Sequence, residues 1–337
     1  MMKKGESQIG LVSYGIYLPQ AFETAEEVAA RSGLSKEEVV FNLGIGKKCK
    51  PSDADQPVPM AIKAALDALE RAPEVEPSDI DVVIWTGEEY KDYVAQTASI
   101  RIQEEIGARN AWAFDMVGQG VTSLVGLRTA RDLMIGDTSV RTVLLVGGTR
   151  NVDLVDYTNP NTRWMLATSA SGGAMVLRRG HPSNHLSGMA VIVDYEMADE
   201  VYVPGGGTVH PFSAQTIGTN LMYYHTPHPQ TVHTYLNNRF SQKLVEVIQR
   251  AMGGENGVDY LALRHLNPRD RARVLKEFDL SSEQSASLEN VGHHGPNDPL
   301  ISLDLALKEG RIHEGTLVVL AAAGIGFAYA GVQLVWG

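Results

Sequence analysis

The chain has little cysteine, little positive charge and no long apolar run. A single cysteine, Cys49, among 337 residues excludes an internal disulfide and any multi-cysteine zinc or iron–sulfur site, which fits a reducing compartment. Acidic residues outnumber basic ones, 40 to 29, so the net charge of −11 disfavours nucleic acid and anionic membranes as partners. No window offers the roughly 18 apolar residues of a membrane span. The start, MMKKGESQIG, lacks the apolar segment of a secretory signal. These absences predict a cytoplasmic protein.

What is present is an ordinary globular composition, in which β-branched segments alternate with segments of helical period. This alternation predicts an α/β fold with crossover helices between the strands. Strands are expected at 9–17, 81–86, 111–115, 142–147, 172–178, 187–195, 260–266 and 316–320, with a last strand closing the chain. Helices are expected at 25–31, 59–71, 95–106, 121–135, 231–252, 269–278 and 301–309.

The order of these elements repeats once along the chain. Each half closes with a strand entered through glycines, GGAMVLRR and AAAGIGFAYAGVQLVW, which indicates an internal duplication. The polar stretch RRGHPSN separates the halves, so domains are predicted at 1–180 and 185–337. Residues 202–230 are rich in glycine, proline and histidine without a clear period, which predicts a functional loop that caps or walls a tunnel.

Several strings in a fixed order resemble the thiolase superfamily, most closely its 3-oxoacyl-(acyl carrier protein) synthase III branch, over essentially the whole chain. They are AFDM at 113–116, PGGG at 204–207, the strand that ends in His265, GHHGPNDPLISLDLALKEGRI at 292–312 and AGIGFAYAG at 323–331. The resemblance implies a duplicated fold of two similar α/β halves in a layered α-β-α-β-α arrangement.

The resemblance also implies acyl transfer from a thioester by a cysteine at a helix N-terminus, where N–H groups and the helix dipole favour a thiolate. Here that position falls on Gly120, which cannot be acylated, while Cys49 is interpreted as an ordinary loop residue. The oxyanion hole is expected to survive, formed by the amide of Gly120 and by the turn that contains Ile325 and Gly326.

Three further positions match catalytic groups of related enzymes. His265 matches the first histidine of the family, with a structural core histidine as the alternative. His293 falls on the family's asparagine and could donate an N–H to a thioester carbonyl, unless His293 and His294 are a solvated loop pair. Glu88, in WTGEEYKDY, resembles the general acid/base of the hydroxymethylglutaryl-CoA synthase branch, with Glu89 close by and an exposed acidic loop as the alternative.

The expected partners follow from the same resemblance. Arg269 and Arg273 belong to a basic helix that could contact an acyl carrier protein or the phosphates of coenzyme A, or could be a solvated face. Coenzyme A or carrier protein would enter as thioester substrate, with no resident cofactor. No metal site is predicted, because prolines interrupt the histidines of YYHTPHPQTVH. A homodimer is expected, with the strand at 142–147 in its interface.

Three functions remain open. The first is an acyltransferase that works without a covalent acyl-enzyme, in which Ser123 or Thr122 could stand in as a weaker nucleophile. The second is a malonyl-thioester decarboxylase that uses Gln119, since related ketosynthase domains with glutamine for cysteine decarboxylate malonyl groups. The third is a non-catalytic subunit retained for its dimer or docking surface.

Overall fold

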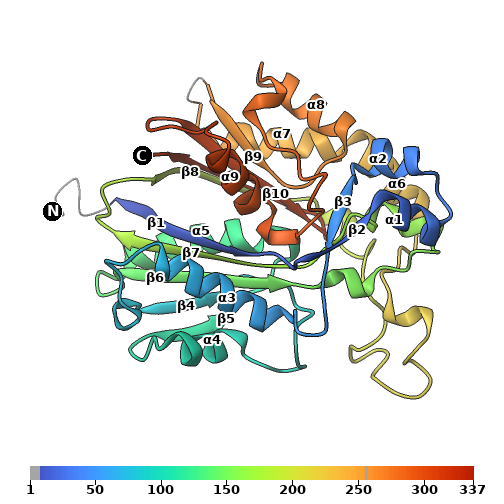
Figure 1. Ribbon diagram of the computed structural model, residues 1–337, viewed down its shortest axis with the longest axis horizontal. Coiled ribbons are helices and arrows are strands. Elements are labelled where there is room, and N and C mark those ends of the chain that lie inside the picture. Colours follow the sequence, from blue (N-terminus) through green and yellow to red (C-terminus); the bar gives the residue numbers. More distant parts are fainter. Residues whose placement is uncertain (1–7, 255–256) are drawn as a thin grey trace.

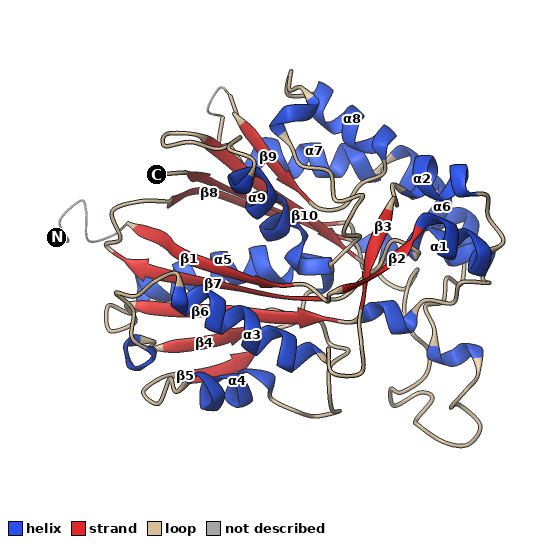
Figure 2. Ribbon diagram, in the orientation of Figure 1, coloured by secondary structure: helices blue, strands red, loops and turns tan. Residues whose placement is uncertain are grey.

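The computed structural model describes residues 8–254 and 257–337, which form a mixed α/β architecture (Figures 1 and 2). Its strands are β1 (Ile9–Tyr17), β2 (Ala21–Thr24), β3 (Lys47–Lys50), β4 (Val82–Trp85), β5 (Trp112–Asp115), β6 (Thr142–Thr149), β7 (Ser171–Arg179), β8 (His185–Val193), β9 (Tyr260–Leu263), β10 (Leu317–Gly324) and β11 (Ala328–Val335). Its α-helices are α1 (Ala25–Ser32), α2 (Lys36–Leu43), α3 (Pro57–Glu70), α4 (Ala98–Ile106), α5 (Thr122–Gly136), α6 (Pro229–Asn238), α7 (Phe240–Ala251), α8 (Pro268–Lys276) and α9 (Asp298–Lys308).

Nine strands join in one sheet whose two ends mirror each other. The order is β5-β4-β6-β7-β1-β8-β11-β10-β9, and β1 meets β8 at a single pair, Gly10 with His185. On one side β5, β4 and β6 are parallel and β7 is antiparallel to β6. On the other side β9 and β10 are parallel and β11 is antiparallel to both β10 and β8. The duplicated order expected from the sequence is therefore present.

Alternate residues of each strand face opposite layers, as the period of a strand requires. Val82 and Ile84 of β4 pack in a core with α5 and α9, and the same core takes Tyr260 of β9 from the other half. Val83 of β4 faces the opposite way, toward α3 and α4. On the far side, β9 and β10 pack against α7 and α8. Because β1 and β8 share a single pair, the strands of the two halves form two layers, with α5 and α9 between them. The layers therefore run helix, sheet, helix, sheet, helix, which confirms the predicted fold class.

The structure corrects several local expectations. The helix expected at 231–252 is divided at Arg239 into α6 and α7. The sequence reading missed β2, β3 and α2, although a capping box of Ser35 and Glu38 begins α2 and Gly44 ends it. Cys49 belongs to β3 and not to a loop. The division of the chain at 180–184 remains a prediction.

The segment between β8 and α6 contains little regular structure and in Figure 1 its yellow loop extends away from the layers. Val209 and Phe212 on this loop are 81% and 53% exposed. Of this segment, Tyr224 lines the main cavity, so most of the loop expected as a tunnel wall faces solvent. Within the described residues, no helix is long and apolar enough to cross a bilayer.

Candidate active site

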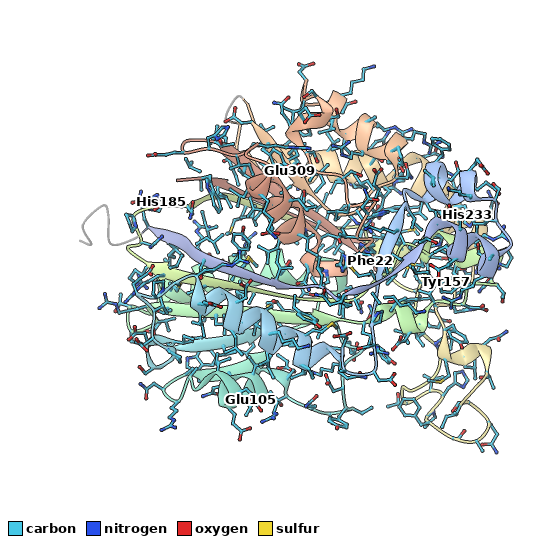
Figure 3. The ribbon with its side chains drawn as sticks, viewed as in Figure 1. Phe22, Glu105, Tyr157, His185, His233 and Glu309 are labelled. Atoms are coloured by element: carbon cyan, nitrogen blue, oxygen red, sulfur yellow. The ribbon has the colours of Figure 1, made fainter. Side chains whose placement is uncertain are left out.

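A cavity of about 480 Å³ opens where the carboxyl ends of strands from both halves meet. Such strand ends are where α/β folds gather functional groups. His233 of α6 is part of the lining, and Figure 3 places it at the end of the molecule opposite His185. Six residues expected from the sequence line this cavity: Glu88, Gln119, Gly120, His265, His293 and Ile325. Gly326, Arg269 and Arg273 are not part of its lining.

Gly120 lies where backbone fills the space of a side chain. A Cβ on Gly120 would be 2.6 Å from the carbonyl oxygen of Ala323, and a Cβ on Gly324 would be 2.7 Å from the nitrogen of Gly120. Real Cβ atoms do not approach backbone this closely, because the contact is repulsive. The nucleophile position therefore has neither a thiol nor room for one, while the backbones of Gly120 and Ile325 still border the cavity.

Gln119 precedes this glycine in a left-handed backbone conformation, with φ of 56°. Such a conformation is uncommon for a residue with a side chain and is enriched at functional turns. The hydroxyl of Thr122 holds the turn, because it donates to the carbonyl of Gln119 at 2.6 Å and accepts from the amide of Gly118 at 2.9 Å. Gln119 thus lines the cavity from a fixed turn directly before α5.

The hydroxyl groups considered as replacement nucleophiles are unavailable. Ser123 donates to the carbonyl oxygen of Pro296, and Thr122 donates to that of Gln119. Both side chains are buried, and neither residue lines the cavity. The expectation that Ser123 or Thr122 could act as a nucleophile is therefore wrong.

His265 is a buried, neutral histidine at the cavity. Its Nε2 lies 3.1 Å from the carbonyl oxygen of Gly44, which requires an N–H at that nitrogen. Burial lowers the pKa of His265 to about 4, because the charged imidazolium would be desolvated. The remaining ring nitrogen, Nδ1, therefore carries a lone pair. His265 and His293 face each other with their ring centroids 6.2 Å apart.

His293 is held between an acid and a base. Its Nδ1 donates to Oδ2 of Asp298 at 2.5 Å, and its Nε2 lies 3.2 Å from a nitrogen of Arg264, which can only donate. Both ring nitrogens are therefore engaged, and no imidazole N–H is left for a thioester carbonyl. The group beside His293 with free donors is the guanidinium of Arg264. His294 is completely buried, so the alternative of a solvated histidine pair is wrong.

Asp298 and Arg264 are functional candidates that sequence reasoning missed. Asp298, the first residue of α9, accepts from the backbone amides of His265 and His294 as well as from His293. Burial opposes its ionisation, but His293 and the two amides hold the pKa of Asp298 well below its usual range. The available signal was an acidic residue in the first turn of a helix. No sequence pattern marked Arg264, because it lies within the strand expected at 260–266.

Glu88 carries a buried carboxyl group that has no hydrogen-bond partner among the residues that the structure describes. The residue is 3% exposed and its Oε2 is unpaired. Burial raises the pKa of Glu88 to about 8, so the acid is mostly protonated at neutral pH. Because Glu88 is buried and lines the cavity, the alternative of an exposed acidic loop is wrong for this residue; Glu89 beside it is exposed.

The predicted basic groups and Cys49 lie outside the cavity. Arg269 and Arg273 of α8 are exposed, and each contacts Asn237, which does line it, at 3.4 Å. Cys49 is buried, and burial raises the pKa of its thiol to about 12, so it is no nucleophile. Within the described ranges, no group of three or more histidine, cysteine or acidic residues could hold a metal ion.

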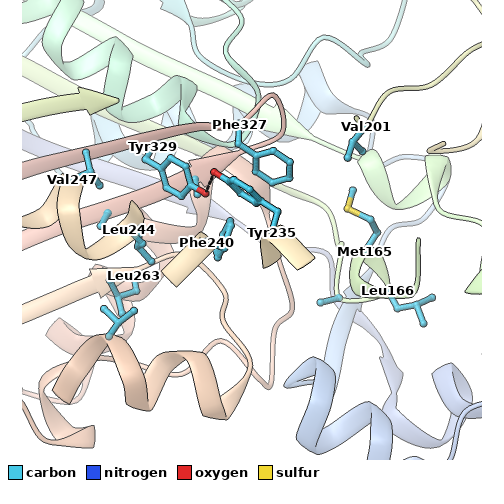
Figure 4. Close-up of a cluster of buried hydrophobic side chains, with 14 of the residues drawn as sticks. Met165, Leu166, Val201, Tyr235, Phe240, Leu244, Val247, Leu263, Phe327 and Tyr329 are labelled. Atoms are coloured by element: carbon cyan, nitrogen blue, oxygen red, sulfur yellow. Dashed lines mark hydrogen bonds between the residues drawn. The ribbon is translucent and has the colours of Figure 1, made fainter. Parts of the chain in front are cut away.

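An aromatic wall completes the site. Phe240 and Phe327 line the cavity, and Phe327 packs on Tyr235 with ring centroids 5.0 Å apart. Behind them the hydroxyls of Tyr235 and Tyr329 are joined by a hydrogen bond of 2.9 Å (Figure 4). A cavity with an apolar wall and a few converging polar groups is typical of a small-molecule site.

Comparison with known proteins shows the family to which the chain is related. Residues 114–194 match the family model 3-oxoacyl-[acyl-carrier-protein] synthase III, and residues 248–336 match its C-terminal model. The chain is 25% identical to the β-ketoacyl-[acyl-carrier-protein] synthase III of Syntrophomonas wolfei, covering 98% of both chains. It is 26% identical to that of a Chelativorans species, covering 96% of this chain and 97% of the relative.

Solved structures share the fold over nearly the whole chain. The 3-oxoacyl-(acyl carrier protein) synthase III of Pseudomonas aeruginosa superposes with a TM-score of 0.83 at 21% identity, covering 98% of each chain. OleA of Xanthomonas campestris with bound lauric acid and lauroyl-CoA gives 0.80 at 16% identity, covering 98% of this chain and 99% of OleA. The duplicated, five-layered fold is that of the thiolase superfamily. Within it, the chain belongs to the 3-oxoacyl-[acyl-carrier-protein] synthase III family.

Proposed function

We propose that this protein acts on acyl thioesters without forming a covalent acyl-enzyme. The observation that carries the proposal is the unpaired carboxyl group of Glu88 in the cavity that His265 also lines. In the same cavity, backbone fills the space that a cysteine side chain at Gly120 would need. A desolvated carboxylic acid with a pKa near neutrality is suited to giving and taking a proton. Glu88 would serve as acid or base while the thioester is transferred or condensed directly.

The remaining groups would position the thioester. The amides of Gly120 and Ile325 border the cavity and would receive the developing oxyanion. His265 offers a lone pair at Nδ1, and Asp298 with Arg264 fixes the ring of His293. Relatives are named for acyl carrier protein substrates, and the exposed Arg269 and Arg273 would contact the acidic carrier or the phosphates of coenzyme A.

Activity on defined thioesters tests this function. Purified protein incubated with acyl-coenzyme A and acyl carrier protein thioesters, with and without a malonyl partner, should release thiol without any mass increase of the protein. Glu88→Gln should lower the rate by roughly 10²- to 10⁴-fold, the usual contribution of a general acid or base. If no thioester is consumed and the chain binds a catalytic relative tightly, a non-catalytic subunit becomes the better reading.

Decarboxylation of a malonyl thioester is a second candidate. Its support is Gln119, which lines the cavity from a left-handed turn one residue before Gly120. The two amides beside it would stabilise the enolate left after loss of carbon dioxide. Release of carbon dioxide from malonyl thioester that disappears in Gln119→Ala would support this reading, and unchanged release in that variant would exclude Gln119.

The homodimer expected from the sequence is proposed here with a different strand. The strand at 142–147 is part of β6, which lies between β4 and β7 and is buried throughout, so it has no free edge. The sheet ends in two edge strands, β5 and β9. The residues of β9 are all buried, whereas Trp112 of β5 is 50% exposed and stacks on Phe114 at 5.4 Å. We expect two copies to pair along β5, because an edge strand presents unpaired N–H and C=O groups and aromatic residues are enriched at protein interfaces. A cytoplasmic location also stays a prediction.

A further inference from the structure

Arg264 presents an incompletely used guanidinium at the cavity. A guanidinium has five N–H donors, and one contacts Nε2 of His293 at 3.2 Å. Nε of Arg264 is buried without a hydrogen-bond partner, although the residue lines a cavity. Among residues 8–254 and 257–337 no ion pair of Arg264 is formed within 4.0 Å, whereas the neighbouring Asp298 pairs with His293.

The two carboxylates that act on the charge of Arg264, those of Asp298 and Asp270, are already committed to other partners. Asp298 accepts from His293 and from the backbone amides of His265 and His294. Asp270, also in the lining, faces Arg273 at 3.5 Å and Asn267 at 2.8 Å. Burial opposes the charge of Arg264, and a buried charge is costly until it is paired. An anion from outside the chain would supply the missing partner.

We propose that Arg264 binds a carboxylate carried by the substrate, so that the acyl group handled in this cavity ends in a free carboxylic acid. The planar fork of arginine matches a carboxylate with two parallel hydrogen bonds. Phe240 supports the guanidinium from one side, with Cζ 5.0 Å from the ring centroid, and limits the directions in which it can donate.

The location favours a carboxylate on the acyl group over a phosphate of the carrier. Arg264 directly precedes His265 and contacts His293, so it lies among the groups that border the cavity at Gly120. The arginines of α8 that could meet phosphates, Arg269 and Arg273, lie outside the lining. The anion is therefore expected at the reacting end of the thioester.

This inference rests on the proposed thioester function and favours its first form over decarboxylation. Loss of carbon dioxide removes the negative charge of the carboxylate. A cation that holds this charge stabilises the ionised ground state more than the transition state, which slows the reaction. Arg264 would thus retain the carboxylate and select for it.

Binding of matched neutral and anionic analogues tests the inference without turnover. The probes are stable amide analogues of N-acetylcysteamine thioesters, in which NH replaces the thioester sulfur. Three acyl groups are compared: succinyl, the methyl ester of succinyl, and butyryl. Calorimetry with wild type should show the succinyl compound bound roughly 10- to 100-fold more tightly than its methyl ester. Arg264→Met should abolish this preference, and Arg264→Lys should keep part of it.

Controls separate the possible outcomes. Arg250→Met, on the exposed surface of α7, should leave the preference unchanged. The melting temperature of Arg264→Met should change little, because the variant removes a charge without a counter-ion and the partner it leaves, Nε2 of His293, belongs to a residue that borders the cavity, where water can replace the hydrogen bond. The affinity for the butyryl compound is also measured with free succinate added. If succinate tightens binding in wild type but not in Arg264→Met, the carboxylate at this arginine belongs to a separate acceptor molecule and not to the acyl group.

Two results would overturn the inference. Equal affinity for the succinyl compound and its methyl ester in wild type removes the carboxylate site and leaves the proposed thioester function standing. Rapid release of carbon dioxide from malonyl-N-acetylcysteamine thioester by wild type also contradicts it. If none of the acyl analogues binds and no thioester is consumed, the proposed function itself fails.

Discussion

Gly295 makes the space in which the carboxyl group of Glu88 is buried. A Cβ on Gly295 would lie 2.6 Å from Oε1 of Glu88, and the φ of Gly295 is 56°, in the left-handed region that favours glycine. The conformation disfavours a side chain here, and an added Cβ would force the carboxyl group of Glu88 to shift. The acid–base group on one loop thus depends on a glycine more than 200 positions later in the sequence.

The substitution Gly295→Ala should therefore displace Glu88. We expect the free energy of unfolding to fall by about 2–4 kcal/mol, from backbone strain together with overpacking, and thioester turnover to fall with it. Gly310→Ala is the matched control, because Gly310 has a similar φ of 66° with nothing within 4 Å of its Cβ. It should cost about 1 kcal/mol. Equal losses in the two variants, measured by urea denaturation, would show that Glu88 is not crowded by Gly295.

The buried acid of Glu88 should make stability depend on pH. Its folded pKa of about 8 lies above its unfolded value, so folding favours the protonated form. The stabilisation is fully present below about pH 4.5 and is lost as the pH rises through about 8. Glu88→Gln, which stays neutral, should lack this dependence. The unfolding free energy of wild type minus that of Glu88→Gln should decline from pH 5 to pH 8. A difference that stays constant over this range would contradict the burial of Glu88.

Restoring a cysteine at the family position should not restore an acyl-enzyme. Gly120→Cys would place Cβ 2.6 Å from the carbonyl oxygen of Ala323, so the variant should lose about 1–3 kcal/mol of stability. It should also show no mass increase with acyl thioester. Gly118→Cys is the control, since its Cβ would meet no atom closer than 3.7 Å. Stable acylation of Gly120→Cys, detected by mass spectrometry, would contradict this prediction and would mean that the backbone of β10 moves to make room for the side chain.

The sequence allowed the fold to be predicted because its signals are local. Strand period and glycine-led closing strands located most elements, and β1 matches the expected range residue for residue. The site was harder, because its contacts join distant segments. Gly295 opposite Glu88, and Asp298 between His265 and His293, depend on tertiary packing that no local pattern records. Likewise, the length of a strand does not tell whether it is internal, as β6 is, or at an edge.

The edge strand β5 gives a test of the dimer. Trp112→Glu would put a charge on the strand edge that we expect at the interface, and removing such an aromatic anchor typically costs 2 kcal/mol or more, about a 30-fold rise in the dissociation constant. Sedimentation velocity should show a dimer for wild type and a larger monomer fraction for the variant. Tyr195→Glu, at an aromatic residue that is 80% exposed, is the control and should remain dimeric. A monomeric wild type would refute the dimer, and dissociation of both variants would refute the role of β5.

A buried lysine holds the cavity wall to which His293 is attached. Lys48 of β3 is 1% exposed and donates to the carbonyl oxygens of Leu166 and Thr168 at 2.7 and 3.0 Å. The same segment binds His293 through its backbone, because the amide of His293 donates to Ala167 and the amide of Ser169 donates back to His293.

Lys48→Met should therefore orphan two buried carbonyl groups, at a cost of roughly 2–5 kcal/mol. It also removes a cation 3.5 Å from Glu23, whose carboxylate keeps Arg31 and Tyr157 as partners. Lys50→Met, exposed on the same strand, should cost less than about 0.5 kcal/mol. Because His293 is hydrogen-bonded to residues 166–169, amide hydrogen exchange in Lys48→Met should be faster than in wild type at 166–169 and 291–294. Exchange in α3 should change less. Uniform acceleration across the chain would instead indicate a global loss of stability, with no specific hold of Lys48 on His293.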